Sequence, residues 1–114
     1  MRIESLGPVV ATRKYFRCDD NQQTTTIQVE LGKPRPSPDA IDEYEFVCPF
    51  RISSSSGLLQ QDSVVGVDEL QSLLLALASI SAKLHALSES LGLPLRWIGD
   101  EHGDLGIRIP DFVN

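Results

Sequence analysis

The sequence predicts an α+β domain in which a sheet of four or five mostly antiparallel strands packs on one long helix. Three observations lead to this fold: β-forming segments fill the first half, one long helical leucine pattern follows, and two short apolar segments come last. A chain of 114 residues is the size of one domain, so a single domain spanning residues 1–114 is expected. The apolar fraction of 41% and the charged fraction of 23% indicate a folded chain.

The first two predicted strands form a hairpin. Residues 8–18 are rich in β-forming side chains, and their imperfect alternation suggests a bulge near Arg13 and Lys14. A cluster of turn residues follows at 19–21, and residues 24–31 then alternate strictly between two faces. The more apolar face of this second strand holds Thr25, Ile27, Val29 and Leu31. Because the connection is short, the two strands are expected to pair antiparallel.

A proline-rich loop separates this hairpin from a third predicted strand. Residues 32–43 contain three prolines, which remove backbone donors and disfavour a central strand. Residues 44–53 again place apolar side chains on one face, and Pro49 among them implies an edge position or a bulge. Residues 57–63 are predicted to be a flexible loop.

The long helix has the clearest pattern in the chain. Its apolar residues are spaced alternately three and four apart over three heptads, which predicts a helix over residues 67–91 with this stripe in the core. The stripe consists of Leu70, Leu73, Leu77, Ile80, Leu84, Leu87 and Leu91. Asp68 and Glu69 suit the positive end of the helix dipole, and Gly92 with Pro94 ends the helix.

Two further strands are predicted after the helix, at residues 95–98 and 105–109, joined by a turn at 99–103. The predicted core combines one face of the strands with the helix stripe and the single tryptophan. Besides the stripe, its members are Ile27, Val29, Leu31, Phe46, Cys48, Phe50, Ile52 and Trp97.

The composition argues against several classes of partner. A net charge of −6, with ten scattered Lys and Arg residues, provides no basic patch, so no nucleic-acid partner is expected. Polar side chains interrupt the most apolar stretch, residues 70–91, and the N-terminus shows no leader pattern, so no membrane span and a cytoplasmic location are expected. Cys18 and Cys48 are interpreted as free buried thiols in a reducing compartment rather than as a disulfide.

Few residues suggest chemistry. The densest polar cluster consists of Asp100, Glu101, His102 and Asp104. Carboxylates beside an imidazole can bind a ligand or a divalent metal, but a solvated hairpin turn explains the same cluster. No second ligand motif is visible, so no metal and no cofactor is predicted. Neither His85 nor His102 belongs to a Ser/His/Asp or Cys/His arrangement, and no catalytic residue is assigned.

The helix face away from the leucine stripe carries small side chains where an exposed helix normally carries charge. This face consists of Ser72, Leu75, Ala78, Ser79, Ala82, Ala86 and Ser90. Small side chains let another helix approach closely, so a second chain is expected to cover the face, most simply in a symmetric homodimer. The alternatives are a covering loop of the same chain and plain exposure to solvent.

Four segments resemble a family of small uncharacterised bacterial proteins known only as a domain of unknown function. They are Cys-Pro-Phe-Arg-Ile at 48–52, the run from glycine to leucine at 66–77, Leu-Arg-Trp at 95–97 and Gly-Asp-Leu-Gly at 103–106. The resemblance covers roughly residues 10–110 and implies a bacterial, cytoplasmic α+β protein. It implies no activity and no catalytic residues.

These observations favour a non-catalytic protein-binding module, comparable to an immunity or adaptor protein. The reasons are the missing catalytic arrangement, the acidic surface and the helix face suited to packing. The partner would be another protein or a second copy of the chain. The alternative is a domain that binds a small molecule or a metal, or an enzyme. Its binding cleft would lie between the sheet and residues 32–43.

Overall fold

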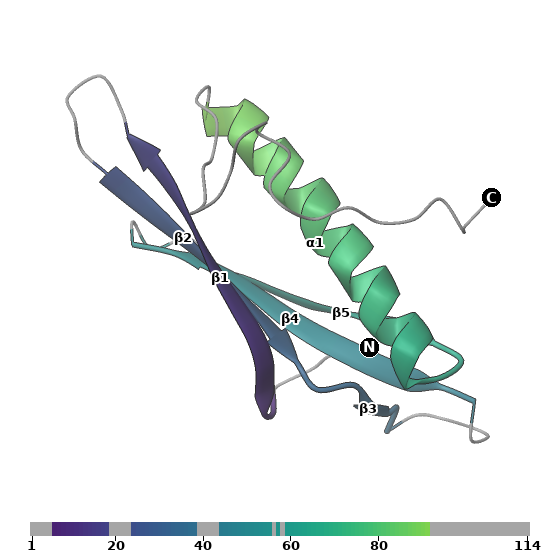
Figure 1. Cartoon of the computed structure of the whole chain (residues 1–114). Helices are drawn as coiled ribbons and strands as arrows, with labels where there is room; N and C mark the ends of the chain where they lie inside the picture. The colour runs from purple at the N-terminus through teal and green to yellow at the C-terminus, as the bar shows by residue number, and fades with distance from the viewer. Residues whose placement is uncertain (1–5, 19–23, 39–43, 56, 58, 92–114) are drawn as a thin grey trace.

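A twisted antiparallel sheet with one long helix laid across one of its faces forms the part of the chain that the structure describes (Figure 1). The structure, a computed structural model, describes residues 6–18, 24–38, 44–55, 57 and 59–91. In chain order its elements are β1 (Val9–Cys18), β2 (Thr24–Gly32), β3 (Arg35–Pro36), β4 (Phe46–Ser54), β5 (Leu59–Gly66) and α1 (Glu69–Leu91). The predicted α+β fold is confirmed as a five-stranded antiparallel sheet against one long helix.

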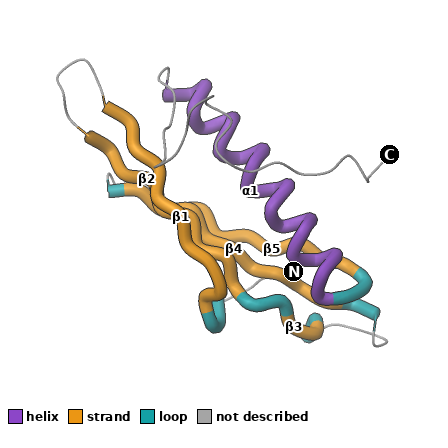
Figure 2. The backbone as a smooth tube through the Cα atoms, in the orientation of Figure 1, coloured by secondary structure: helices purple, strands orange, loops and turns teal. Residues whose placement is uncertain are grey.

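The strands form a meander in which each long strand pairs with the next. β1 pairs with β2, as predicted, with Tyr15 opposite Ile27, and β2 pairs with β4 with Val29 opposite Ile52. β5 pairs with β4 over residues 46–53 and so occupies one whole edge of it. The two-residue β3 therefore lies on the other edge of β4, where it continues β2. Figure 2 shows the strands side by side and the helix lying along one side of the sheet.

Pro49 lies in the central strand β4 and pairs in regular register with Ser63 of β5, so both the predicted edge position and the predicted bulge are wrong. Ser55 donates its backbone N–H to the carbonyl of Thr26 at 3.0 Å, which shows that odd-numbered residues at this end direct their N–H groups toward β2. In the same register Pro49 would face Gly32, one residue beyond the last pair of β2 with β4. The ladder thus stops at the residue that lacks a donor, and β3 resumes it afterwards.

β5 takes the place of a predicted flexible loop. Residues 57–63 lack an apolar alternation, yet Leu59–Gly66 pairs with β4 along its whole length. The backbone ladder of β4 supplies the order that the side-chain pattern does not indicate. Asp62 also forms an ion pair with Lys83 of α1, with 3.7 Å between the carboxylate oxygen and Nζ, which links the strand to the helix.

Two smaller corrections concern β1 and the proline-rich segment. The irregularity in β1 lies between Val9 and Ala11, whereas Arg13 and Lys14 pair regularly with β2. Regular backbone pairing there overrides the uneven side-chain pattern. The segment 32–43, predicted to be a loop, contains the last residue of β2 and the whole of β3.

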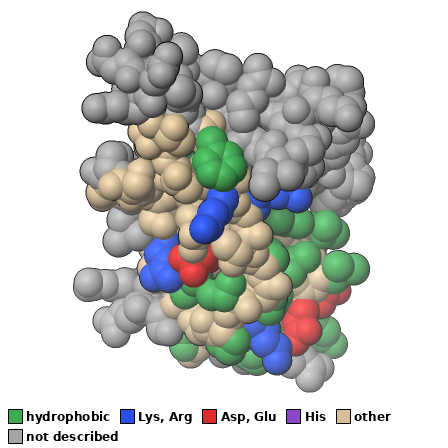
Figure 3. Space-filling model, turned by 60° about the vertical axis from the view of Figure 1, so that its left-hand side comes forward, with side chains coloured by type: hydrophobic (Ala, Val, Ile, Leu, Met, Phe, Trp, Pro, Cys, Tyr) green, Lys and Arg blue, Asp and Glu red, His purple; other side chains and the backbone are tan. Residues whose placement is uncertain are grey.

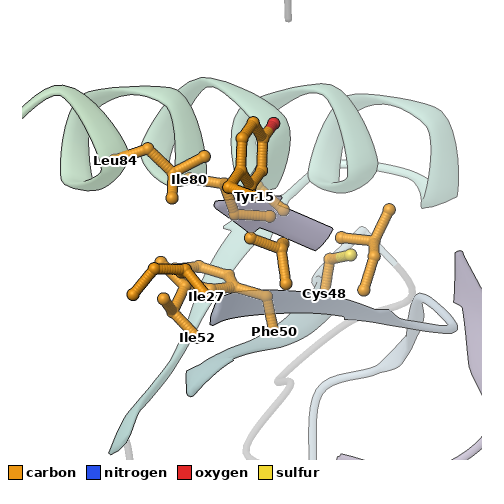
Figure 4. Packing of buried hydrophobic residues seen from close by; sticks show 10 residues of the cluster. Tyr15, Ile27, Cys48, Phe50, Ile52, Ile80 and Leu84 are labelled. Atoms are coloured by element: carbon orange, nitrogen blue, oxygen red, sulfur yellow. The ribbon is translucent and has the colours of Figure 1, made fainter. Parts of the chain in front are cut away.

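The core lies between α1 and the side of the sheet that faces it (Figure 4). Its buried cluster consists of Tyr15, Ile27, Val29, Leu31, Cys48, Phe50, Ile52, Ala76, Ile80 and Leu84. Of the strand residues predicted for the core, all are buried except Phe46, which is partly exposed. Tyr15 was predicted to lie in a strand but not in the core, and it is completely buried. Trp97 lies outside the described residues.

The predicted stripe packs on the core from Leu73 to Leu87, but the helix is turned so that smaller residues beside the stripe are buried as well. Ser72 and Ala76 are completely buried, whereas Leu70, the first residue of the stripe, is 65% exposed. Ile80 and Leu84 belong to the predicted stripe and are buried in the structure. Ser72, predicted to be on the outer side of the helix, is therefore corrected to the sheet side. The reason is space, because near its start the helix lies so close to the end of β5 that a small side chain fits at the point of closest approach.

The tightest contact joins Gly66, the last residue of β5, to the first turn of α1. A Cβ at Gly66 would lie 2.5 Å from the backbone nitrogen of Ser72 and 2.9 Å from its Cα. The Ser72 hydroxyl donates to the carbonyl of Glu69 at 2.9 Å, so this buried polar group has a partner. Asp68 caps the helix, since its Oδ1 accepts the N–H of Gln71 at 2.7 Å.

Replacing Gly66 with alanine should destabilise the domain by about 1–3 kcal/mol, because the new methyl group would overlap backbone atoms rather than a flexible side chain. We expect the midpoint of urea unfolding, followed by circular dichroism, to fall accordingly. The matched control is Gln60→Ala on the exposed part of the same strand, which should change stability by no more than about 0.5 kcal/mol. A Gly66→Ala variant as stable as the native protein would contradict the close contact.

Candidate functional site

The predicted ligand-binding cluster lies outside the described residues. This holds for Asp100, Glu101, His102 and Asp104, and for the strands predicted at 95–98 and 105–109. Within the described ranges, no three His, Cys, Asp or Glu side chains come together as a candidate metal site. His85 is described and lies on the exposed side of α1. Ligand binding by the cluster therefore stays a prediction.

Cys48 is a buried free thiol on the sheet face that packs on α1. Its Sγ lies 3.5 Å from the carbonyl oxygen of Gly32, which accepts a weak hydrogen bond from the thiol. Burial raises the pKa of the Cys48 thiol to about 11, because the charged thiolate loses its hydration there. A protonated and inaccessible thiol is not a nucleophile, so Cys48 contributes to packing.

The sheet face turned away from α1 is polar at its centre. Arg51 of β4 and Glu30 of β2 stand opposite each other, with 3.0 Å between Nη2 and Oε1, and Nε donates to the same oxygen. Thr12 of β1 and Gln61 of β5 flank the pair in the same row. The space-filling view shows basic and acidic side chains in contact among uncharged polar groups (Figure 3). A neutralised cross-strand pair suits a solvated sheet face and leaves no free base or nucleophile in this row.

Apart from Ser90, which is exposed near the end of α1, five of the other six helix residues of the predicted contact face lie outside the buried side of the helix. They are Leu75, Ala78, Ser79, Ala82 and Ala86, and we call them the outer face of α1. The first three are partly buried and the last two are exposed. Ser72 is the sixth, and it is buried against Gly66. Along this part of the helix, from Leu70 to Ala82, no residue is charged.

By length and composition alone, α1 could cross a membrane, and 22% of its most apolar window is buried within the protein. One such helix is weak evidence, because core helices of water-soluble domains meet the same two criteria. Here the sheet side of α1 packs on the strands through Ala76, Ile80 and Leu84. The absence of a membrane partner therefore stays an expectation.

Exposed large hydrophobic residues gather at one corner of the domain, which the sequence patterns did not single out. Of the six such residues among those described, four lie where β4 begins, β5 ends and α1 begins (Figure 1). They are Tyr44, Val65, Val67 and Leu70, exposed by 62%, 48%, 54% and 65%, and we call them the corner patch. Phe46 pairs with Gly66 in the ladder, which brings Tyr44 to the same end of the sheet as the other three.

Hydrogen bonds at the start of α1 hold the corner patch in place. Val67 donates its N–H to Oε1 of Gln71 at 2.7 Å, and Asp68 caps the same turn. In many helices an apolar residue before the cap packs on an apolar residue at the fourth helical position. That position is Ser72, which lies under Gly66, so Val67 gains no such partner. An apolar residue before an Asp cap, with serine at the fourth position, is the sequence signal that could have indicated this exposure.

The fold and these surfaces define a class: an α+β domain in which one helix covers one face of an antiparallel meander, with apolar surface left exposed at its edge. The chain belongs to the family of the domain of unknown function DUF6968, whose model matches residues 11–109. This confirms the resemblance found in the sequence, and it brings no activity with it. No curated protein and no solved structure matches the chain.

The raised pKa of Cys48 should make stability depend on pH. The contribution of this group is complete below pH 9 and is lost as the pH rises toward 11, because the unfolded chain ionises the thiol while the folded protein keeps it protonated. The free energy of unfolding should fall by about 1 kcal/mol per pH unit in that range from this group. Urea unfolding of a Cys48→Ala variant should show a shallower decline above pH 9 than the native protein. Parallel declines would show that the thiol ionises equally in both states.

Proposed function

We propose that this domain is a non-catalytic protein-binding module, adaptor-like or immunity-like in role, that acts in the cytoplasm. The observation that carries the proposal is the outer face of α1. From Leu70 to Ala82 the helix has no charged residue, although Leu75 and Ala78 are only partly buried and Ala82 is exposed. A helix side that faces only water normally carries Glu, Lys and Arg. An uncharged side of this kind favours contact with another protein.

A second copy of the chain is the simplest partner for the outer face. Across a two-fold axis the small residues Ala78 and Ala82 would meet their own counterparts, so two helices could approach closely. The helix has 23 residues, which makes it about 34 Å long and gives such a contact several turns. Lys83 does not obstruct the contact, because its Nζ is turned to Asp62 on the sheet at 3.7 Å.

The described polar groups support a binding role rather than chemistry. Cys48 is buried and protonated, and the Arg51–Glu30 pair on the far sheet face is neutralised internally. A reduced buried thiol is also the ordinary state of cysteine in the cytoplasm, which agrees with the proposed location. The immunity-like or adaptor-like role is an analogy based on the acidic character of the chain.

Sedimentation velocity of the native protein and an Ala82→Glu variant tests the proposal. At tens of micromolar, we expect the native protein to sediment as a dimer and the variant as a monomer, because a two-fold contact would bury two like charges. Ala82 is exposed, so the substitution leaves the core intact. The matched control is Gln60→Glu, which adds the same charge at an exposed position of β5 and should leave the dimer unchanged.

If the native protein sediments as a monomer at these concentrations, the proposed self-association is wrong. The same samples should be mixed with phosphatidylcholine vesicles and centrifuged. Vesicle binding that Ala82→Glu abolishes and Gln60→Glu preserves would make the outer face a membrane-binding surface, and the protein-binding proposal would then fail.

A further inference from the structure

We propose that the corner patch docks a segment of a partner protein in which apolar side chains are flanked by Lys or Arg. The inference rests on the proposed protein-binding function and adds to it a second surface and the chemistry of the partner. The corner patch is distinct from the outer face of α1, which begins at Leu75, more than one turn beyond Leu70.

The first reason is the clustering of exposed apolar side chains. Single exposed hydrophobic residues are common on soluble proteins, but contiguous groups mark contact sites. Val65, Val67 and Leu70 fall within six residues of chain, and Tyr44 joins them from the start of β4. Val65 stands opposite Val47 in the ladder, and Val47 is completely buried. Val65 therefore lies beside buried apolar surface, on the sheet face turned away from α1.

The second reason is that the corner patch is already ordered before any partner arrives. The backbone N–H of Val67 donates a hydrogen bond to Oε1 of Gln71 at 2.7 Å. The backbone N–H of Gln71 donates to Oδ1 of Asp68, also at 2.7 Å. The contact between Gly66 and Ser72 fixes the angle between β5 and the helix. A surface held in this way loses little conformational freedom on binding, so more of the contact energy appears as affinity.

The third reason is charge, which also selects the kind of partner. Glu45 precedes β4, and Asp68 and Glu69 begin α1, so three carboxylates border the patch in a chain of net charge −6. Asp68 and Glu69 are exposed, and Glu45 is partly exposed. Basic groups beside the apolar residues of a partner would complement this border. A second copy of the chain would instead bring like charges together, which disfavours self-association at this site.

The cation on the neighbouring strand β3 is Arg35. Arg35 pairs with Val47 on the edge of β4 opposite to β5, so β4 separates it from Val65. Arg35 is partly buried, and a Cβ at Gly7 would lie 2.8 Å from its Nη1. Its guanidinium therefore lies against Gly7 in the N-terminal segment.

The test is an NMR titration of the isotope-labelled protein with two synthetic amphipathic helical peptides of equal length. One peptide is built from Leu and Lys and the other from Leu and Glu. We expect the Leu/Lys peptide to shift the amide resonances of Val65, Val67 and Leu70. The Leu/Glu peptide should bind at least about tenfold more weakly, because its carboxylates meet the acidic border.

Variants show whether the contact uses the corner patch. Val67→Ser combined with Leu70→Ser should weaken binding of the Leu/Lys peptide about tenfold, since both side chains are exposed and neither supports the core. The matched control is Val10→Ser, which removes an equally exposed valine (51%) on β1 and should leave the affinity unchanged. Glu45→Gln combined with Glu69→Gln should reduce the affinity several-fold and flatten its dependence on salt.

Three results would overturn the inference: equal binding of both peptides, unchanged binding by the Val67→Ser/Leu70→Ser variant, or shifts centred on Ala78 and Ala82. Binding to phosphatidylcholine vesicles that this variant alone abolishes would assign the patch to a membrane and would also overturn it. The sedimentation result is independent. If the protein is a dimer and does not bind the Leu/Lys peptide, only the corner-patch inference fails. If it is a monomer and binds the peptide at the corner patch, self-association fails and protein binding still holds.

Discussion

The close approach of α1 to the end of β5 is the constraint on which the rest of the arrangement depends. Gly66 has no side chain, and the backbone of Ser72 occupies the space that a Cβ would need. With the helix held this near, the completely buried side chains of its first turns are the small ones of Ser72 and Ala76. Ile80 and Leu84 fill the wider space further along. The rotation of the helix about its axis follows from this order of small and large side chains.

The same rotation decides which apolar side chains reach solvent. Leu70 would be buried if the leucine stripe faced the sheet squarely, and it is instead turned outward at the corner. Val67 stays at the corner because its backbone N–H donates a hydrogen bond to the side chain of Gln71. Exposed apolar surface of this kind in a folded domain usually marks contact with another molecule. The two candidate surfaces, the outer face and the corner patch, are therefore consequences of one packing contact.

Charge distinguishes the corner from the open side of the sheet. On the sheet, Glu30 and Arg51 neutralise each other at 3.0 Å, which suits a face in contact with water. At the corner, the carboxylates of Asp68 and Glu69 stand beside apolar side chains, and neither forms an ion pair with another described residue. Membership of DUF6968 supplies no activity, so the physical character of these surfaces is the guide to function.

Local sequence patterns determined the α+β class, the β1–β2 hairpin and the extent of α1, because period-two alternation and heptad spacing are properties of neighbouring residues. They also identified most of the strand core, since alternation specifies which side is buried. β5 was missed because its polar residues show no alternation and the ladder of β4 makes it a strand. The burial of Ser72 and the exposure of Leu70 were decided only by the tertiary structure. They depend on how closely the helix approaches Gly66. This distance is set by a tertiary contact, so a pattern of neighbouring residues does not determine it.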